Sequence, residues 1–173
     1  MNNKVLSSAK RIARIGVISA TLIAGKFVLS FIPNVEVITT LIIVYAVVFG
    51  FESVFATLVF CTADILIYPP SLDVIISYYV YFNLLSILCA TFSGVGIKSK
   101  SFYIAFGGIM TVLFGVITSF FYSLFYGTPF YAVYVAGLLY YAIHLISTVV
   151  FTLVGYTPLM KLLTKIKENG LKN

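Results

Sequence analysis

The sequence predicts an all-α integral membrane protein, formed by one bundle of six transmembrane helices with both termini in the cytoplasm. Of its 173 residues, 61% are hydrophobic and only 9% are charged, whereas soluble proteins carry about 25% charged residues. At roughly 20 residues for each span, the chain has room for about six helices joined by tight loops. Residues 1–173 are therefore expected to form a single transmembrane domain.

The distribution of the eleven Lys and Arg residues predicts the orientation. They gather in the first 14 residues, in the pair Lys98 and Lys100, and in a segment from Lys161 to Lys172, while Lys26 lies inside an apolar run. Because cytoplasmic loops retain Lys and Arg, all three clusters are predicted to face the cytoplasm. The net charge of +6 then reflects orientation and contacts with the lipid bilayer, and no nucleic acid is expected as a partner.

The region 37–68 decides the number of spans. One helix here would place Lys98 and Lys100 outside, whereas two helices broken at Gly50-Phe51-Glu52 place them inside with the other clusters. The expected helices are 8–31, 37–50, 52–67, 73–94, 101–126 and 130–156. A basic tail follows over 159–173, either as a short helix at the inner headgroups or as an extension of the last span.

The first expected helix has two distinct faces. One face is a stripe of small residues at spacings of three and four, formed by Ala9, Ala13, Gly16, Ala20 and Ala24. Small residues let another membrane helix approach closely, either inside the bundle or on a partner. Lys26 lies about 120° round the helix from this stripe, beside Ser19, Leu22 and Ser30.

Two ionisable side chains lie within later apolar spans. Asp64 lies one turn from the outer end of 52–67, and an isolated carboxylate there is costly, so it is expected to meet Lys26 or a bound ligand. A purely structural pair and a ligand-linked pair both remain open. His144 in the last span is expected to be a hydrogen-bonding residue of the bundle rather than a proton carrier.

Polar and aromatic side chains recur at helical spacing in the last three helices. We expect Tyr79 and Asn83, with Tyr122 and Tyr141, to line a pocket in the outer half of the bundle, because aromatic rings stack on flat ligands. No nucleophile–base pair, metal-ligand spacing or phosphate-binding loop appears in the sequence. We therefore expect neither an enzyme nor a bound cofactor or metal.

The segment Phe31-Ile-Pro-Asn-Val-Glu-Val-Ile-Thr39, the apolar helix ending at Phe49-Gly50, and the stripe ending in Ala20-Thr-Leu-Ile-Ala24 resemble a known family. This family is the substrate-binding S components of energy-coupling factor (ECF) vitamin transporters. The resemblance is strongest over residues 9–52, and beyond them it rests on the number and character of the helices.

The resemblance implies a subunit in the cell membrane of a bacterium, typically a Gram-positive one, that captures a vitamin or related micronutrient at the outer face. Its partners would be a transmembrane coupling protein and two cytoplasmic ATPases. The resemblance further implies that Ala13, Gly16, Ala20 and Ala24 contact the coupling protein. It also implies that the loop with Pro33, Asn34 and Glu36 helps to close the ligand pocket.

In such a pocket Lys26 would attract a carboxylate or phosphate, Asp64 an amine or ring N–H, and Asn34 and Asn83 would fix polar edges. A heterocyclic, partly charged ligand fits this set, although the sequence leaves the particular nutrient open. The alternative is a stand-alone secondary transporter or small channel that uses Asp64 and His144, but the sequence shows no inverted repeat. A membrane-embedded hydrolase would need a nucleophile or metal cluster.

Overall fold

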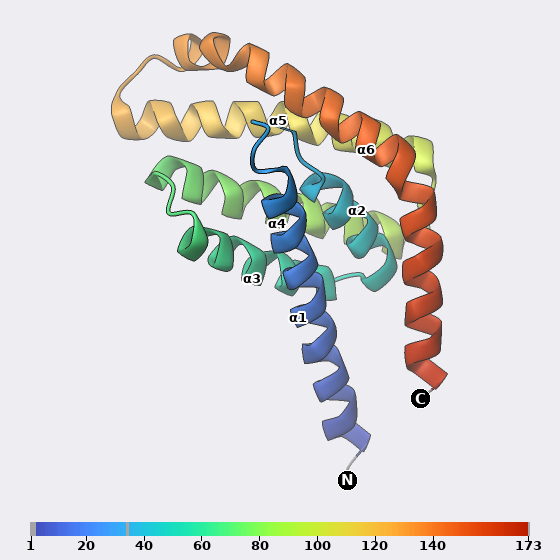
Figure 1. Cartoon of the computed structure of the whole chain (residues 1–173). Coiled ribbons are helices and arrows are strands. Elements are labelled where there is room, and N and C mark those ends of the chain that lie inside the picture. Colours follow the sequence, from blue (N-terminus) through green and yellow to red (C-terminus); the bar gives the residue numbers. More distant parts are fainter. Residues whose placement is uncertain (1–2, 34, 173) are drawn as a thin grey trace.

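The computed structural model describes residues 3–33 and 35–172, and this part of the chain contains six helices and no strand. Figure 1 shows α1 (Asn3–Leu29), α2 (Ile38–Phe49), α3 (Glu52–Ile67), α4 (Leu72–Gly94), α5 (Lys100–Tyr126) and α6 (Phe130–Lys172). Helices α1, α4, α5 and α6 each contain a stretch long and apolar enough to cross a membrane. The predicted all-α fold is confirmed, and α2 to α5 begin and end within one residue of the predicted bounds.

Helix α2 lies at the centre of the bundle. It contacts each of the other five helices, and ten of its twelve residues are buried. Hydroxyl pairs join it to its neighbours: Tyr45 to Thr21 at 2.6 Å and Thr40 to Thr152 at 2.9 Å. A 12-residue helix is only about 18 Å long. It is shorter than a usual transmembrane span, and the other helices surround it and shield its backbone polar groups.

The chain breaks between α2 and α3 where the sequence predicts it. Gly50 has a φ of 63°, a conformation that residues with a Cβ rarely adopt, and its N–H donates to the carbonyl of Ala46 at 2.9 Å. The next helix then begins at Glu52. Residues 37–68 therefore form two helices rather than one.

Helices α1 and α3 pack side by side in the same direction. Arg14 binds Glu52 through two hydrogen bonds of 2.9 Å, and Lys26 binds Asp64 at 2.5 Å. Between these ion pairs, the buried Ser19 hydroxyl donates to the carbonyl of Ala56 at 3.0 Å. The sequence separation is 37 or 38 residues at all three contacts, so the two helices keep a constant register.

The outermost helices depart from the predicted bounds. Helix α1 begins at Asn3 rather than at 8, and it ends at Leu29 rather than at 31 because tight turns follow it before Pro33. Helix α6 continues past 156 through Pro158 to Lys172. Figure 1 shows that α6 bends sharply, so that both termini extend from the bundle on the same side. A proline bends a helix because it lacks an N–H and crowds the preceding turn.

Candidate functional site

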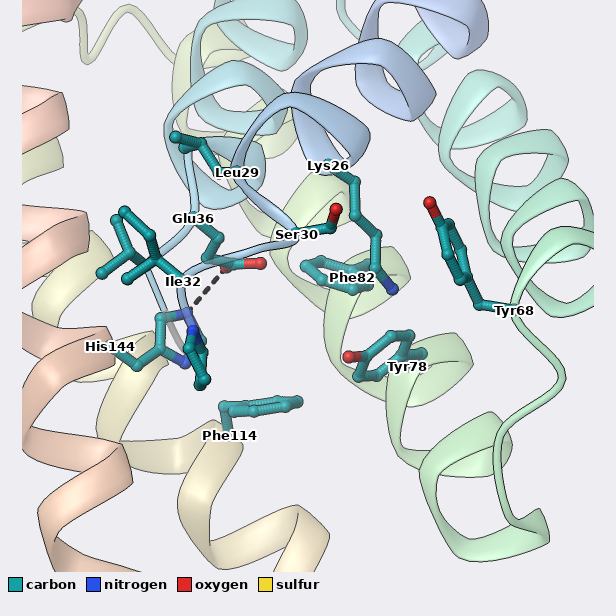
Figure 2. Close-up of a pocket in the computed structure, with 12 residues that line it drawn as sticks. Lys26, Leu29, Ser30, Ile32, Glu36, Tyr68, Tyr78, Phe82, Phe114 and His144 are labelled. Carbon is teal, nitrogen blue, oxygen red and sulfur yellow. Dashed lines mark hydrogen bonds and ion pairs between the residues drawn. The ribbon is translucent and has the colours of Figure 1, made fainter.

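A cavity of about 370 Å³ lies where α1 ends against the bundle. Its size falls in the range of small-molecule sites. Figure 2 shows the side chains that line it, which come from four helices, from the loop after α1 and from Tyr68 just after α3: Lys26, Leu29, Ser30, Ile32, Pro33, Val35, Glu36, Tyr68, Tyr78, Phe82, Phe114 and His144.

Lys26 supplies a cation to one side of this cavity. Its Nζ lies 2.5 Å from Oδ2 of Asp64 and 4.4 Å from the ring centre of Tyr78. Asp64 is buried and does not line the cavity, whereas Lys26 does. The ion pair and the aromatic ring together offset the cost of keeping an ammonium within apolar surroundings. The other N–H groups of Lys26 remain available to a ligand.

Glu36 supplies an acceptor to another side of the cavity. Its Oε1 accepts a hydrogen bond from the Thr39 hydroxyl at 2.8 Å and lies 2.7 Å from Nε2 of His144. The second carboxylate oxygen has no hydrogen-bond partner among the described residues, and Figure 2 shows it pointing into the cavity on the side of Lys26. The cavity therefore presents a donor and an acceptor at separate positions.

The environment of Glu36 keeps its carboxylate ionised. Burial by itself would raise the pKa of this carboxyl group, but the nearby charge and hydrogen bond of His144, with the hydrogen bond from Thr39, hold the pKa below the ordinary value of 4.5. Glu36 lies in the loop between α1 and α2. The loop therefore carries a fixed negative charge into the site.

Two hydrogen bonds hold this loop against α6. The backbone N–H of Glu36 donates to the Ser147 hydroxyl at 2.9 Å, and that hydroxyl donates to the Glu36 carbonyl at 3.0 Å. His144 and Ser147 lie about 21 and 26 Å along α6 from its first residue, Phe130, by helical rise. The cavity thus reaches His144, which was expected only as a hydrogen-bonding residue of the bundle.

Aromatic rings form a continuous wall on the remaining side. Tyr78 packs against Phe82 at 5.2 Å and against Phe114 at 6.0 Å between ring centres. Phe114 in turn packs edge-on against His144 at 5.1 Å. Rings held by one another in this way offer a flat ligand a rigid surface on which to stack.

Three of the predicted ligand-binding residues meet at this site. Lys26 and Glu36 line the cavity, and Asp64 holds Lys26 from behind. Asn34 lies outside the described residues. Pro33 also lines the cavity, as the resemblance implies for this loop.

The structure places the other four predicted residues away from this cavity. Tyr79 bonds Thr62 at 2.8 Å, Asn83 donates to the Tyr79 carbonyl, Tyr122 packs on Tyr126, and Tyr141 bonds Ser119 at 2.9 Å. On α4, the residues that line the cavity are Tyr78 and Phe82, one position before the predicted pair. One position turns a helix by about 100°, so the predicted residues lie on a different face of α4 from the residues that line the cavity.

Tyr78, Phe82, Phe114 and His144 were not predicted as ligand-binding residues. The spacing of four between Tyr78 and Phe82 is the signal that could have found two of them. Periodic hydropathy does not identify the inner face of a membrane helix, because lipid is as apolar as the protein core.

The small residues of α1 lie on its free side. Ala13, Gly16, Ala20 and Ala24 are exposed, whereas Leu22, which shares the Lys26 face, is fully buried. Nothing lies within 4 Å of a Cβ built on Gly16. One helix thus turns a polar face to the cavity and a smooth face away from the bundle.

Comparisons with protein-family models, with curated proteins and with solved structures gave no match. Among residues 3–33 and 35–172, no group of three or more His, Cys, Asp or Glu side chains is arranged to hold a metal ion. Cys61 and Cys89 are free and buried.

Proposed function

We propose that this chain is the membrane-embedded substrate-capture subunit of an ECF-type importer. It binds a vitamin or related small nutrient at the extracellular side and docks on a shared energising module. The observation that carries the proposal is the cavity, where Lys26 and the free oxygen of Glu36 flank an aromatic wall. Sites for small molecules combine apolar walls with a few polar groups in this way.

Six spans with both termini in the cytoplasm complete the proposal. Helices α2 and α3 join the four longer apolar helices, and the resulting even number of crossings places all three basic clusters on one side. In support, Figure 1 shows both termini on the same side of the bundle. The cell membrane of a bacterium is the proposed location.

The ligand is a flat, partly charged heterocycle. Lys26 binds its carboxylate or phosphate, and Glu36 binds an amine or ring N–H. Glu36 takes this second role instead of Asp64, because Asp64 is already engaged by Lys26 and lies outside the cavity lining. Tyr78 and Phe114 stack on the ring.

The exposed stripe of α1 is the proposed contact with the transmembrane coupling protein, which two cytoplasmic ATPases drive. Ala and Gly side chains are small, so a second helix can approach closely. Within a membrane such close packing drives helix association, because lipid provides no hydrophobic driving force. Its separation from the Lys26 face supports a division of α1 into a docking side and a binding side.

Native mass spectrometry of the protein purified from cells grown in rich medium tests the proposal. We expect a small molecule to co-purify with the wild-type protein and to be less abundant with Tyr78→Leu, while Tyr141→Phe, altered outside the cavity, retains it. A folded wild-type protein that carries no small molecule, and gains none from a nutrient mixture, would contradict the proposal.

The alternative is a stand-alone secondary transporter, and one observation favours it. Two ion pairs, Lys26–Asp64 and Glu36–His144, lie beside one cavity, and proton-driven transporters use such titratable groups. Vesicles that contain this protein alone distinguish the two functions. We expect no concentrative uptake, and uptake driven by a proton gradient would establish the alternative.

A further inference from the structure

A second cavity, of about 380 Å³, lies at the other end of α2 from Glu36. It is enclosed by the end of α2, the turn to α3, the end of α4 with the following loop, and the part of α6 beyond its bend. The side chains and backbone that line it are Val47, Val48, Phe49, Gly50, Phe51, Ala90, Ser93, Gly94, Lys98, Met160, Thr164 and Lys167.

Two lysines give this cavity a positive charge. Lys167 donates from Nζ to the Val48 carbonyl at 2.5 Å, which leaves two further N–H groups. The Lys98 side chain is exposed, and it has no ion pair or hydrogen bond among the described residues. No carboxylate lines the cavity. Two acids follow lining residues directly along the chain. Glu52, after Phe51, is already bound by Arg14, and Glu168, after Lys167, lines a different pocket.

Apart from Ser93 and Thr164, the other side chains of the cavity wall are apolar. Phe49, Ala90 and Met160 line it, and Phe51 at its edge is 57% exposed. A free inorganic anion would satisfy the lysines and leave these apolar groups uncovered. A molecule with a phosphate and hydrocarbon chains would cover both kinds of surface.

The cavity also joins segments that are distant in sequence. The Tyr156 hydroxyl donates to the Lys98 carbonyl at 2.9 Å, just before Pro158 and the bend of α6 that Figure 1 shows. Lys167 then returns to the end of α2. A ligand held by Lys98 and Lys167 would therefore fasten the bent part of α6 to the bundle.

We propose that this cavity binds an anionic phospholipid, with its phosphate between Lys98 and Lys167 and its acyl chains along Phe51 and Met160. Basic pockets between membrane helices recognise such headgroups. The site requires only that the chain lies in a membrane, and it is independent of the nutrient cavity.

Native mass spectrometry with added phosphatidylglycerol, and with phosphatidylcholine of the same acyl chains, tests this site. We expect phosphatidylglycerol to bind more tightly, with an affinity about fivefold lower for each lysine removed in Lys98→Gln and in Lys98→Gln/Lys167→Gln. The matched control is Lys161→Gln/Lys165→Gln, which removes the same charge from α6 outside this cavity. It should bind as the wild-type protein does.

Three outcomes would overturn the site. Phosphatidylcholine could bind equally well, the control could lose as much affinity as the double cavity variant, or inorganic phosphate at the same concentration could displace the lipid. If Lys98→Gln/Lys167→Gln does not fold, Lys98→Gln alone decides, because the Lys98 side chain makes no ion pair or hydrogen bond within the described chain. Unchanged affinity in that variant refutes the proposal.

Discussion

The ammonium of Lys26 lies 2.5 Å from the carboxylate of Asp64 while facing the cavity beside Tyr78. The Asp64 side chain is only 4% exposed, whereas that of Lys26 is 24% exposed. One cation thus connects a buried acid on α3 with an open site. The structural role and the ligand-binding role that the sequence left open are both possible in this single geometry.

We expect Lys26→Met to destabilise the protein by about 3 kcal/mol, because it leaves Asp64 buried without its partner. Lys26→Met/Asp64→Asn removes both charges and should recover most of the free energy of unfolding, yet its ligand affinity should stay lost. Thermal unfolding in detergent and native mass spectrometry measure the two effects separately.

The matched control for this pair is Arg14→Met, which breaks the more exposed ion pair with Glu52 in the same pair of helices. It should cost less than about 1 kcal/mol and leave ligand binding unchanged. If the double variant at Lys26 and Asp64 binds ligand like the wild-type protein, Lys26 is structural only.

The sequence predicted the helices well because two strong signals operate there. The expectation that the positive clusters share one side predicted an even number of helices before Lys98, and Gly50 marked the break that gives this number. The position of Glu36 against Ser147 has no such signal, since the two residues are 111 positions apart and no local pattern records their contact. The face of α4 that lines the cavity has no such signal for a different reason: apolar residues occur on both faces of this helix.

Exchanges of aromatic residues distinguish the observed cavity from the predicted pocket. Tyr78→Leu removes both the ring that faces Lys26 and a stacking surface, so ligand affinity should fall about tenfold, which corresponds to about 1.4 kcal/mol. Tyr141→Phe removes only the hydrogen bonds of this hydroxyl with Ser119 and Thr118, and should cost about 1 kcal/mol of stability with no change in affinity. Titration calorimetry with the identified ligand measures both affinities. If the pocket lay between α5 and α6, Tyr141→Phe would lose affinity and Tyr78→Leu would not.

Stability should decrease at acid pH through Glu36. Its pKa in the folded protein lies below the ordinary 4.5, so its stabilising contribution is complete above that value and is lost as the pH falls through the lowered folded pKa. Glu36→Gln cannot titrate and should show a weaker decrease of the unfolding temperature over this acid range. Unfolding curves of both proteins at a series of pH values measure the difference, and parallel curves would assign the acid sensitivity to other groups.

Bulky substitutions on the α1 stripe should separate binding from transport. Ala20→Leu and Ala24→Leu point away from the bundle, so stability should change by less than about 0.5 kcal/mol and ligand affinity should persist. Transport by the assembled importer should fall at least about tenfold, because the added side chain keeps the partner helix at a distance. Ile12→Phe, also exposed on α1 but about 80–120° round the helix from Ala20 and Ala24, is the control. Equal loss of transport in all three variants would show that the stripe has no special role.

Adding a single methyl group at Gly50, in the turn between α2 and α3, should lower the stability of the protein. Gly50→Ala forces a residue with a Cβ to hold a φ of 63°, which costs about 1–2 kcal/mol, although nothing lies within 4 Å of the new atom. The loss therefore comes from the backbone and not from a clash.

The control is Gly94→Ala. The added methyl group also meets open space there, but Gly94 lies at the end of α4 without a positive φ. This substitution should be neutral or slightly stabilising. Chemical unfolding of the two variants in the same detergent compares them directly, and equal stability would mean that the break between α2 and α3 does not depend on glycine.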